Sequence, residues 1–160
     1  MLFHYIRNFQ HTMASLIAFK KDHAHAMVKG IMNSRYTQVD NSLRHLLDGL
    51  EVEDMSFTAI DDNENIICSG GIVPMWEGVY EGWVMASKLS YDYPVTSARV
   101  IKKGLEKLVK DFNVIRLQTA VKKDFETGKR FAAWLGMTFE GNMPKYQNKQ
   151  DYLRYARIYR

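Results

Sequence analysis

Apolar residues in the first third of the chain recur at the spacing of a helix. In residues 12–35, TMASLIAFKKDHAHAMVKGIMNSR, they stand at roughly helical intervals: Met13, Leu16, Ile17, Met27 and Ile31. The spacing predicts helix here, with a break near Asp22. A second helix is predicted over residues 40–50, DNSLRHLLDGL, because its leucines share one face. Asp40 or Asn41 suits its N-cap, and Gly49 suits its end.

The pattern then changes to runs that are rich in β-branched and aromatic residues. The runs MSFTAI, IICSGGIVPMW and VYEGWVMAS, residues 55–60, 66–76 and 79–87, each predict a strand. The polar DDNEN between the first two suits a hairpin turn, and a short turn around Glu77 and Gly78 joins the last two. Pro74 has no N–H to donate, so it belongs at a strand end or edge.

The clearest helix follows, where apolar residues recur three and four positions apart: Ala98, Ile101, Leu105, Leu108 and Phe112. Asp92 suits its N-cap and Pro94 its first turn, while Asn113 suits its exit.

The last third alternates strands with a short helix. Strands are predicted at 114–121, 137–141 and 151–159, and a helix at 124–136. The whole order predicts an α/β fold of the α+β type. It has N-terminal helices, one mixed and mostly antiparallel central sheet, and a strand–helix–strand–helix–strand second half. Residues 1–160 are expected to form a single domain.

Composition adds limits to this picture. The 160 residues are 46% hydrophobic and 25% charged, which suits one globular domain, and no run approaches the roughly 20 apolar residues of a membrane span. The single cysteine, Cys68, suits a reducing compartment and is expected to be a buried small side chain. A cytoplasmic location is therefore expected. The net charge of +4 is compatible with an anionic ligand or nucleic acid.

Two segments carry a resemblance to a known family. FETGKRFAAWLGMTFEG, residues 125–141, resembles the late segment of the GNAT acyl-CoA N-acetyltransferases, where a short helix ends in a glycine before a large apolar residue. Gly136 and Met137 stand at that junction. Together with VPMWEGVYEGWVMAS, residues 73–87, it is most similar to GNAT-like proteins encoded by tailed bacteriophages.

The resemblance implies a site for acetyl-CoA as cosubstrate. Two strands, at 83–87 and 116–120, would part and expose backbone groups to the pantetheine chain, and the pyrophosphate would lie at residues 88–97, beside a helix N-terminus. The implied cofactor-binding residues are Met85, Ala86, Ser87, Lys88, Val95, Thr96, Ser97, Gln118 and Thr119. Glu81 is the candidate general base, and Tyr93 is the candidate general acid.

The sequence also departs from the family pattern. Residues 88–97 contain no glycine, although glycines normally let the backbone approach the phosphates. Ala132 stands where the family commonly has a tyrosine. The alternative is therefore a non-catalytic GNAT-fold phage structural or assembly protein that binds a virion partner and is virion-associated. The acceptor amine and the oligomeric state, including a homo-oligomer, stay open.

Other constellations are weaker. His23 and His25 lie two apart on a predicted helix, so they would not chelate a metal together and are expected to face solvent. No metal site is predicted. Clustered aromatics, Trp76, Tyr80, Trp83, Tyr91 and Tyr93, suit stacking on a base, a core or a protein interface. The basic, tyrosine-rich C-terminal stretch suits nucleic-acid phosphates or a charged edge strand equally.

Overall fold

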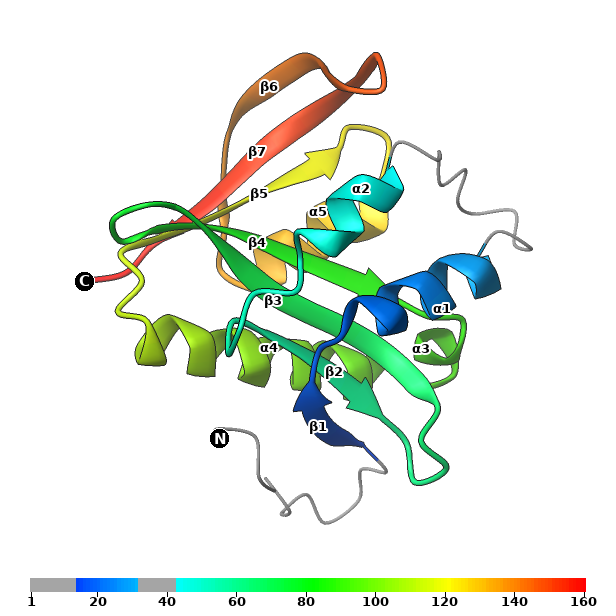
Figure 1. Ribbon diagram of the computed structural model, residues 1–160. Helices are drawn as coiled ribbons and strands as arrows, with labels where there is room; N and C mark the ends of the chain where they lie inside the picture. The colour runs from blue at the N-terminus through cyan, green and yellow to red at the C-terminus, as the bar shows by residue number, and fades with distance from the viewer. Residues whose placement is uncertain (1–13, 32–42) are drawn as a thin grey trace. The chain divides into compact units, whose positions relative to one another are not determined.

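A computed structural model describes residues 14–31 and 43–160 of the chain (Figure 1). The helices and strands follow in the order β1 (Ser15–Ala18), α1 (Lys21–Ile31), α2 (Leu43–Asp48), β2 (Ser56–Ile60), β3 (Ile66–Trp76), β4 (Val79–Ala86), α3 (Leu89–Asp92), α4 (Pro94–Asp111), β5 (Arg116–Lys122), α5 (Glu126–Trp134), β6 (Thr138–Gln147) and β7 (Gln150–Ile158).

The strands form one seven-stranded sheet in the order β1-β2-β3-β4-β5-β7-β6. β4 and β5 are parallel, whereas β1 with β2, β2 with β3, β5 with β7 and β6 with β7 are antiparallel. The predicted α/β class with a mixed sheet is confirmed. The chain divides into two compact units, residues 1–73 with 83–108 and residues 74–82 with 109–160. That residues 1–160 form a single domain stays a prediction.

The first predicted helix is wrong in its N-terminal part. Residues 15–18 form β1, which pairs with β2 in an antiparallel register from Ser15↔Ile60 to Ala18↔Phe57, and helix begins only at Lys21. Leu16 and Ile17 fit a helical spacing, but pairing with the edge of β2 decides their conformation. Met13 and the caps expected at Asp40 or Asn41 lie outside the described residues.

The loop expected at residues 88–97 is mostly helical. Leu89–Asp92 form the short helix α3, and α4 starts at Pro94, in the first turn as predicted. Asp92 is therefore the last residue of α3 and not the N-cap of α4, which corrects the prediction. The N-cap position falls to Tyr93, whose carbonyl accepts the N–H of Ser97 at 2.9 Å. Asn113 follows the helix in a left-handed conformation (φ 48°), as expected at its exit.

The central hairpins agree with the sequence. The carboxylate of Asp61 accepts the N–H groups of Asn63 and Asn65 at 2.9 and 2.8 Å, which holds the turn between β2 and β3. Gly78 adopts φ 71° between β3 and β4, and a Cβ there would lie 2.7 Å from the Ile115 side chain. Pro74 is exposed near the end of β3.

Two apolar layers enclose the sheet of the unit that contains residues 83–108. On one side, α1 and α2 bury a cluster against β4: Phe19, Ala24, Val28 and Leu47, with Leu50, Trp83 and Met85 packed against it. On the other side, the ring of Phe57 on β2 lies against Gly104 of α4, where a Cβ would approach the ring to 2.4 Å. Figure 1 shows α4 behind β2, in agreement with this contact.

The glycine junction after α5 is a helix C-cap of the Schellman type. The N–H of Met137 donates to the carbonyl of Ala132 at 3.1 Å, and the N–H of Gly136 donates to Ala133 at 2.9 Å. Gly136 has φ 82°, and Ala132 and Met137 are both buried. Arg157 of β7 donates from Nη1 to the carbonyl of Leu135 at 2.9 Å, which satisfies a further helix-end carbonyl.

The last hairpin extends further than predicted. β6 runs from Thr138 to Gln147, because Asn148 and Lys149, both with positive φ (50° and 60°), form a two-residue turn into β7. Pro144 is tolerated in β6 because this strand ends the sheet. In the ranges that the structure describes, no helix is long and apolar enough to cross a membrane.

Gly136→Ala tests the C-cap. An alanine there adopts the left-handed conformation at a cost and crowds the Arg157 guanidinium, 3.1 Å from the new Cβ, so the free energy of unfolding should fall by about 1–2 kcal/mol in urea titrations. Gly49→Ala is the matched control, since Gly49 also follows a helix but is not among the positive-φ glycines, and should change stability by less than about 0.5 kcal/mol. Equal losses in both variants would contradict the assignment.

Cys68 provides a second test. It is fully buried in β3, as expected, and burial raises the pKa of its thiol from 9.0 to about 12. Iodoacetamide at pH 8 should therefore leave the folded chain unmodified and alkylate it in urea, as read by intact mass. As the pH rises, the thiol ionises first in the unfolded chain. The contribution of the buried thiol to the free energy of unfolding is therefore full below pH 9 and is lost as the pH rises toward 12. Alkylation of the folded chain at the unfolded rate would disprove the burial.

Candidate functional site

The parallel pairing of β4 and β5 is short. It joins Val79–Glu81 to Arg116–Gln118, and the last pair in the register is Glu81↔Gln118. Both strands continue beyond it, β4 to Ala86 and β5 to Lys122. β5 stays paired with β7 as far as Lys122↔Tyr152, so its other edge remains a regular ladder.

β4 is likewise held on its other edge. The N–H of Ser87 donates to the carbonyl of Ile67 in β3 at 3.0 Å, and the Ser87 hydroxyl lies 2.6 and 2.8 Å from the carbonyls of Ile66 and Ile67. Ser87 thus anchors the end of β4 with its side chain. In the described part of the chain, the parallel register with β5 includes no residue of β4 after Glu81. Unpaired backbone groups require another hydrogen-bonding partner.

The first turn of α4 offers two backbone donors. The first N–H groups of a helix have no partner within it, and here Pro94 has none to offer. Ser97 directs both its N–H and its hydroxyl to the Tyr93 carbonyl, at 2.9 and 2.7 Å. Val95 and Thr96 therefore supply the helix-end donors that suit an anion.

The predicted cofactor-binding residues on β4 and α3 lie in contrasting environments. Met85 packs against the apolar cluster under α1 and α2, whereas Ala86 and Lys88 are exposed. Tyr93, between α3 and α4, is partly exposed at 36%. On β4, the indole Nε1 of Trp83 is buried with no hydrogen-bond partner.

Glu81, the candidate base, belongs to a connected polar network. Arg154 of β7 donates from Nη1 to both carboxylate oxygens of Glu81 at 2.9 Å. Gln118 of β5 donates from Nε2 to Oε2 of the same carboxylate at 3.1 Å. The Glu81 and Arg154 side chains are only 24% and 19% exposed, so solvent screens this ion pair less than a surface pair.

The network continues to the edge of the sheet. Arg116 donates from Nε to the carbonyl oxygen of the Gln118 side chain at 2.9 Å and forms a two-pronged ion pair with Glu140 of β6. The Glu140 carboxylate raises the pKa of the Arg116 guanidinium, and Arg116 lowers the pKa of Glu140. Sequence reasoning found Glu81 and Gln118 but missed the other three. Arg116 lies 24 positions from Glu140 and Arg154 lies 73 positions from Glu81, so no local sequence pattern indicated these pairs.

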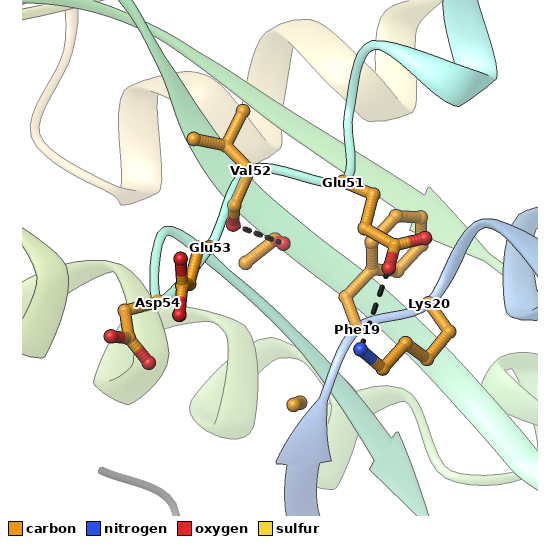
Figure 2. A pocket seen from close by; sticks show the side chains of 8 residues that line it. Phe19, Lys20, Glu51, Val52, Glu53 and Asp54 are labelled. Carbon is orange, nitrogen blue, oxygen red and sulfur yellow. Dashed lines mark hydrogen bonds and ion pairs between the residues drawn. The ribbon is translucent and has the colours of Figure 1, made fainter. Parts of the chain in front are cut away.

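A pocket of about 380 Å³ lies in the unit that contains β1 and β2 (Figure 2). It is lined by Ala18, Phe19, Lys20, Glu51, Val52, Glu53, Asp54 and Ser56. Both carboxylate oxygens of Glu51 already have partners in the protein: one accepts the N–H of Lys21 at 2.7 Å, and the other lies 3.4 Å from Lys20 Nζ. Three carboxylates against one ammonium disfavour an anion such as the phosphates of coenzyme A. No feature of the sequence pointed to this pocket.

The residues present fit acetyl-CoA in part. The β4 edge beyond Glu81 suits the amides of a pantetheine chain, and the N–H groups of Val95 and Thr96, with the exposed Lys88, suit a phosphate. Few hydrogen-bond donors remain for a phosphate. Residues 89–92 form the helix α3 instead of a glycine-rich loop, and the N–H and hydroxyl of Ser97 both donate to the Tyr93 carbonyl. Among the described residues, no group of three histidines, cysteines or acidic residues could hold a metal ion.

No protein-family model and no curated protein matches this sequence. Solved structures do match the fold of this chain. A ribosomal-protein-S5-alanine acetyltransferase from Vibrio fischeri superposes with a TM-score of 0.70 at 16% identity, over 94% of this chain and 95% of that one. A chimera of the spermidine N-acetyltransferase SpeG from Vibrio cholerae and hSSAT gives 0.72 at 12% identity, over 92% and 96%.

A third solved structure, Ard1 from Thermoplasma volcanium, gives a TM-score of 0.74 at 11% identity, over 92% of this chain and 98% of that one. At these identities the likeness shows the fold. The chain therefore has the GNAT fold, in agreement with the expectation from residues 73–87 and 125–141.

The two histidines of α1 have different surroundings. His25 lies 3.2 Å from Asp48 and is partly exposed. His23 was expected to face solvent, but it is partly buried. Its Nδ1 accepts the N–H of Lys20 at 3.1 Å and lies 2.9 Å from the Thr58 hydroxyl, which contacts the buried Ser69 hydroxyl at 2.8 Å. Because Nδ1 accepts, the ring is neutral and caps the start of α1.

His23 should make stability depend on pH. Burial lowers its pKa below 6.5, against the opposing charges of Asp22 and Glu51. Its contribution to stability is full above pH 6.5 and is lost as the pH falls through the lowered pKa, because the unfolded chain binds the proton first. Thermal melts from pH 7.5 to 5 should show this loss in the wild type and a smaller one in His23→Gln. An unchanged slope in His23→Gln would contradict the assignment.

Proposed function

We propose that the chain is an N-acyltransferase that transfers an acetyl group from acetyl-CoA to an amine by direct attack. The observation that carries the proposal is the short β4–β5 register, which ends at Glu81↔Gln118 while β4 runs on to Ala86. Residues 82–86 thereby keep backbone groups for the pantetheine amides. The start of α4 supports it, because Val95 and Thr96 present N–H groups to a phosphate.

In the proposed reaction the amine nitrogen attacks the thioester carbon, a C–N bond forms and the C–S bond breaks. Glu81 accepts the proton that the amine loses, and Tyr93 protonates the departing thiolate. Met85 and Ala86 bind through the β4 backbone. Ser87 instead holds the end of β4, because its N–H donates to Ile67 and its carbonyl accepts hydrogen bonds from Ser90. Lys88, Val95 and Thr96 belong to the phosphate end of the site, and Ser97 supports the first turn of α4 there by donating to the Tyr93 carbonyl. Gln118 and Thr119 are the proposed contribution of β5. Acetyl-CoA supplies the activated acyl group.

The proposed origin is a tailed bacteriophage, with the host cytoplasm as the location, on the resemblance of residues 73–87 and 125–141 alone. A second function is favoured by two observations: α3 occupies the place of the glycine loop, and Ala132 is buried at the position of the usual tyrosine. In that case the chain is a GNAT-fold virion or assembly protein without catalysis. Copies at fixed number in purified virions, together with no acetyl-CoA binding, would select it.

Isothermal titration with acetyl-CoA tests the cofactor site. The wild type should bind, and Lys88→Gln should raise Kd about fivefold, equivalent to about 1 kcal/mol, with the difference shrinking in high salt. Lys110→Gln removes the same charge from the last turn of α4 and is the matched control, with an unchanged Kd. Absence of heat and of a thermal shift with millimolar acetyl-CoA would defeat the proposal.

Turnover requires acceptor probes. Spermidine and a peptide with an N-terminal alanine are suitable, because the structural neighbours are named for a spermidine N-acetyltransferase and a ribosomal-protein-S5-alanine acetyltransferase. Release of the coenzyme A thiol can be followed with a thiol reagent, since the only thiol of the chain, Cys68, is buried.

A further inference from the structure

The carboxylate of Glu81 is fixed from two directions. Arg154 Nη1 lies 2.9 Å from each oxygen, and Gln118 Nε2 lies 3.1 Å from Oε2. Oε2 therefore accepts two hydrogen bonds from these neighbours, whereas Oε1 accepts one. Because a carboxylate oxygen has two lone pairs, Oε1 can accept one further hydrogen bond. A fixed carboxylate with one remaining lone pair has a defined direction for the next donor.

The strand register explains how Arg154 reaches Glu81. Arg154 of β7 stands opposite Ala120 of β5, and Gln118 is paired with Glu81 on the other side of β5. Gln118 and Ala120 share one face of β5 because side chains alternate along a strand. Ala120, the residue opposite Arg154, is small, and the Arg154 side chain reaches across β5 to Glu81.

The orientation of Gln118 is also determined. Its carbonyl oxygen accepts a hydrogen bond from Arg116 Nε at 2.9 Å, so its NH₂ group must face Glu81. Arg116 is in turn held by Glu140 through a two-pronged ion pair. The guanidinium of Arg154 lies 5.9 Å from the ring centre of Tyr146, within range of a cation–π contact. Each donor to Glu81 is therefore itself supported by a neighbour on β5 or β6.

We propose that Arg154 is a positioning residue, which with Gln118 aims the remaining lone pair of Glu81 Oε1 at the acceptor amine. This inference rests on the proposed function, since it gives Glu81 its role as proton acceptor. In this role Arg154 acts through Glu81, to which it donates its hydrogen bonds. A bidentate-capable guanidinium suits the task better than an ammonium, because its planar donors fix the plane of the carboxylate.

The test compares Arg154→Met, Arg154→Lys, Glu81→Gln and the double variant Glu81→Gln/Arg154→Met with the wild type. Each is assayed with acetyl-CoA and with whichever of spermidine or the alanine peptide the wild type acetylates faster. Arg154→Met should lower kcat about 30-fold, because a misaimed proton acceptor loses much of its effect. The Kd for acetyl-CoA should stay unchanged. Arg154→Lys should recover part of the loss, since its ammonium still pairs with Glu81.

The double variant separates positioning from general stability. If Arg154 acts only through Glu81, then Arg154→Met should have no further effect on kcat once Glu81 is glutamine. Arg157→Met is the matched control on the same strand. It removes the hydrogen bond to Leu135 and should lower the melting temperature without changing kcat. If Arg154→Met fails to fold, Arg154→Lys and the Glu81→Gln background still give the comparison.

The outcomes distinguish two failures. If the wild type acetylates an amine and Arg154→Met keeps kcat within about threefold, Arg154 is only a structural ion-pair partner and the inference is overturned while the proposed function stands. An additive loss in the double variant also overturns it. A wild type that neither binds acetyl-CoA nor acetylates either probe defeats the proposed function, and the role of Arg154 with it.

Discussion

The parallel pairing of β4 with β5 is limited to three residues on each strand. The proposed acetyl-CoA site depends on the early end of this pairing. Each strand keeps a partner on its far edge, β3 for β4 and β7 for β5, so neither frays where the parallel register ends. Ser87 reinforces this by bonding the end of β4 to Ile66 and Ile67. Ordered strands whose near-edge backbone groups lack a ladder partner provide donors and acceptors for an extended ligand.

A connected side-chain network lies at the end of this register. Glu81 and Gln118, the final register pair, are bonded through their side chains as well, and Arg154, Arg116 and Glu140 extend the network over β7 and β6. Two arginines balance two glutamates, so the partly buried group carries little net charge. Polar groups at this depth are stable only when their partners are nearly complete.

The strands and helices of the middle and late chain followed from the sequence because their signals are local. The DDNEN turn, Gly78, the apolar face of α4 and the glycine after α5 each act within a few residues, through turn chemistry, helical periodicity or capping. The errors have the opposite character. β1 was predicted as helix because its partners in β2 lie 39 to 45 positions away, from Ala18↔Phe57 to Ser15↔Ile60, and Asp92 was predicted as a cap because α3 was not recognised.

The residues of the candidate site also fall into those that the sequence indicated and those that only the structure revealed. From the sequence came Glu81, Gln118 and the expected phosphate end, through the resemblance to a known fold. The arginine that holds Glu81, the commitment of Ser97 to Tyr93 and the acidic pocket beside Lys20 came only from the tertiary structure. The sequence by itself determined most strands and helices of the middle and late chain, since backbone preference and side-chain periodicity are properties of neighbouring residues, but it did not determine β1 or α3. Only the tertiary structure decided where β4 and β5 stop pairing and which charges meet there, because hydrogen-bond register and ion pairing join residues that are distant in the chain.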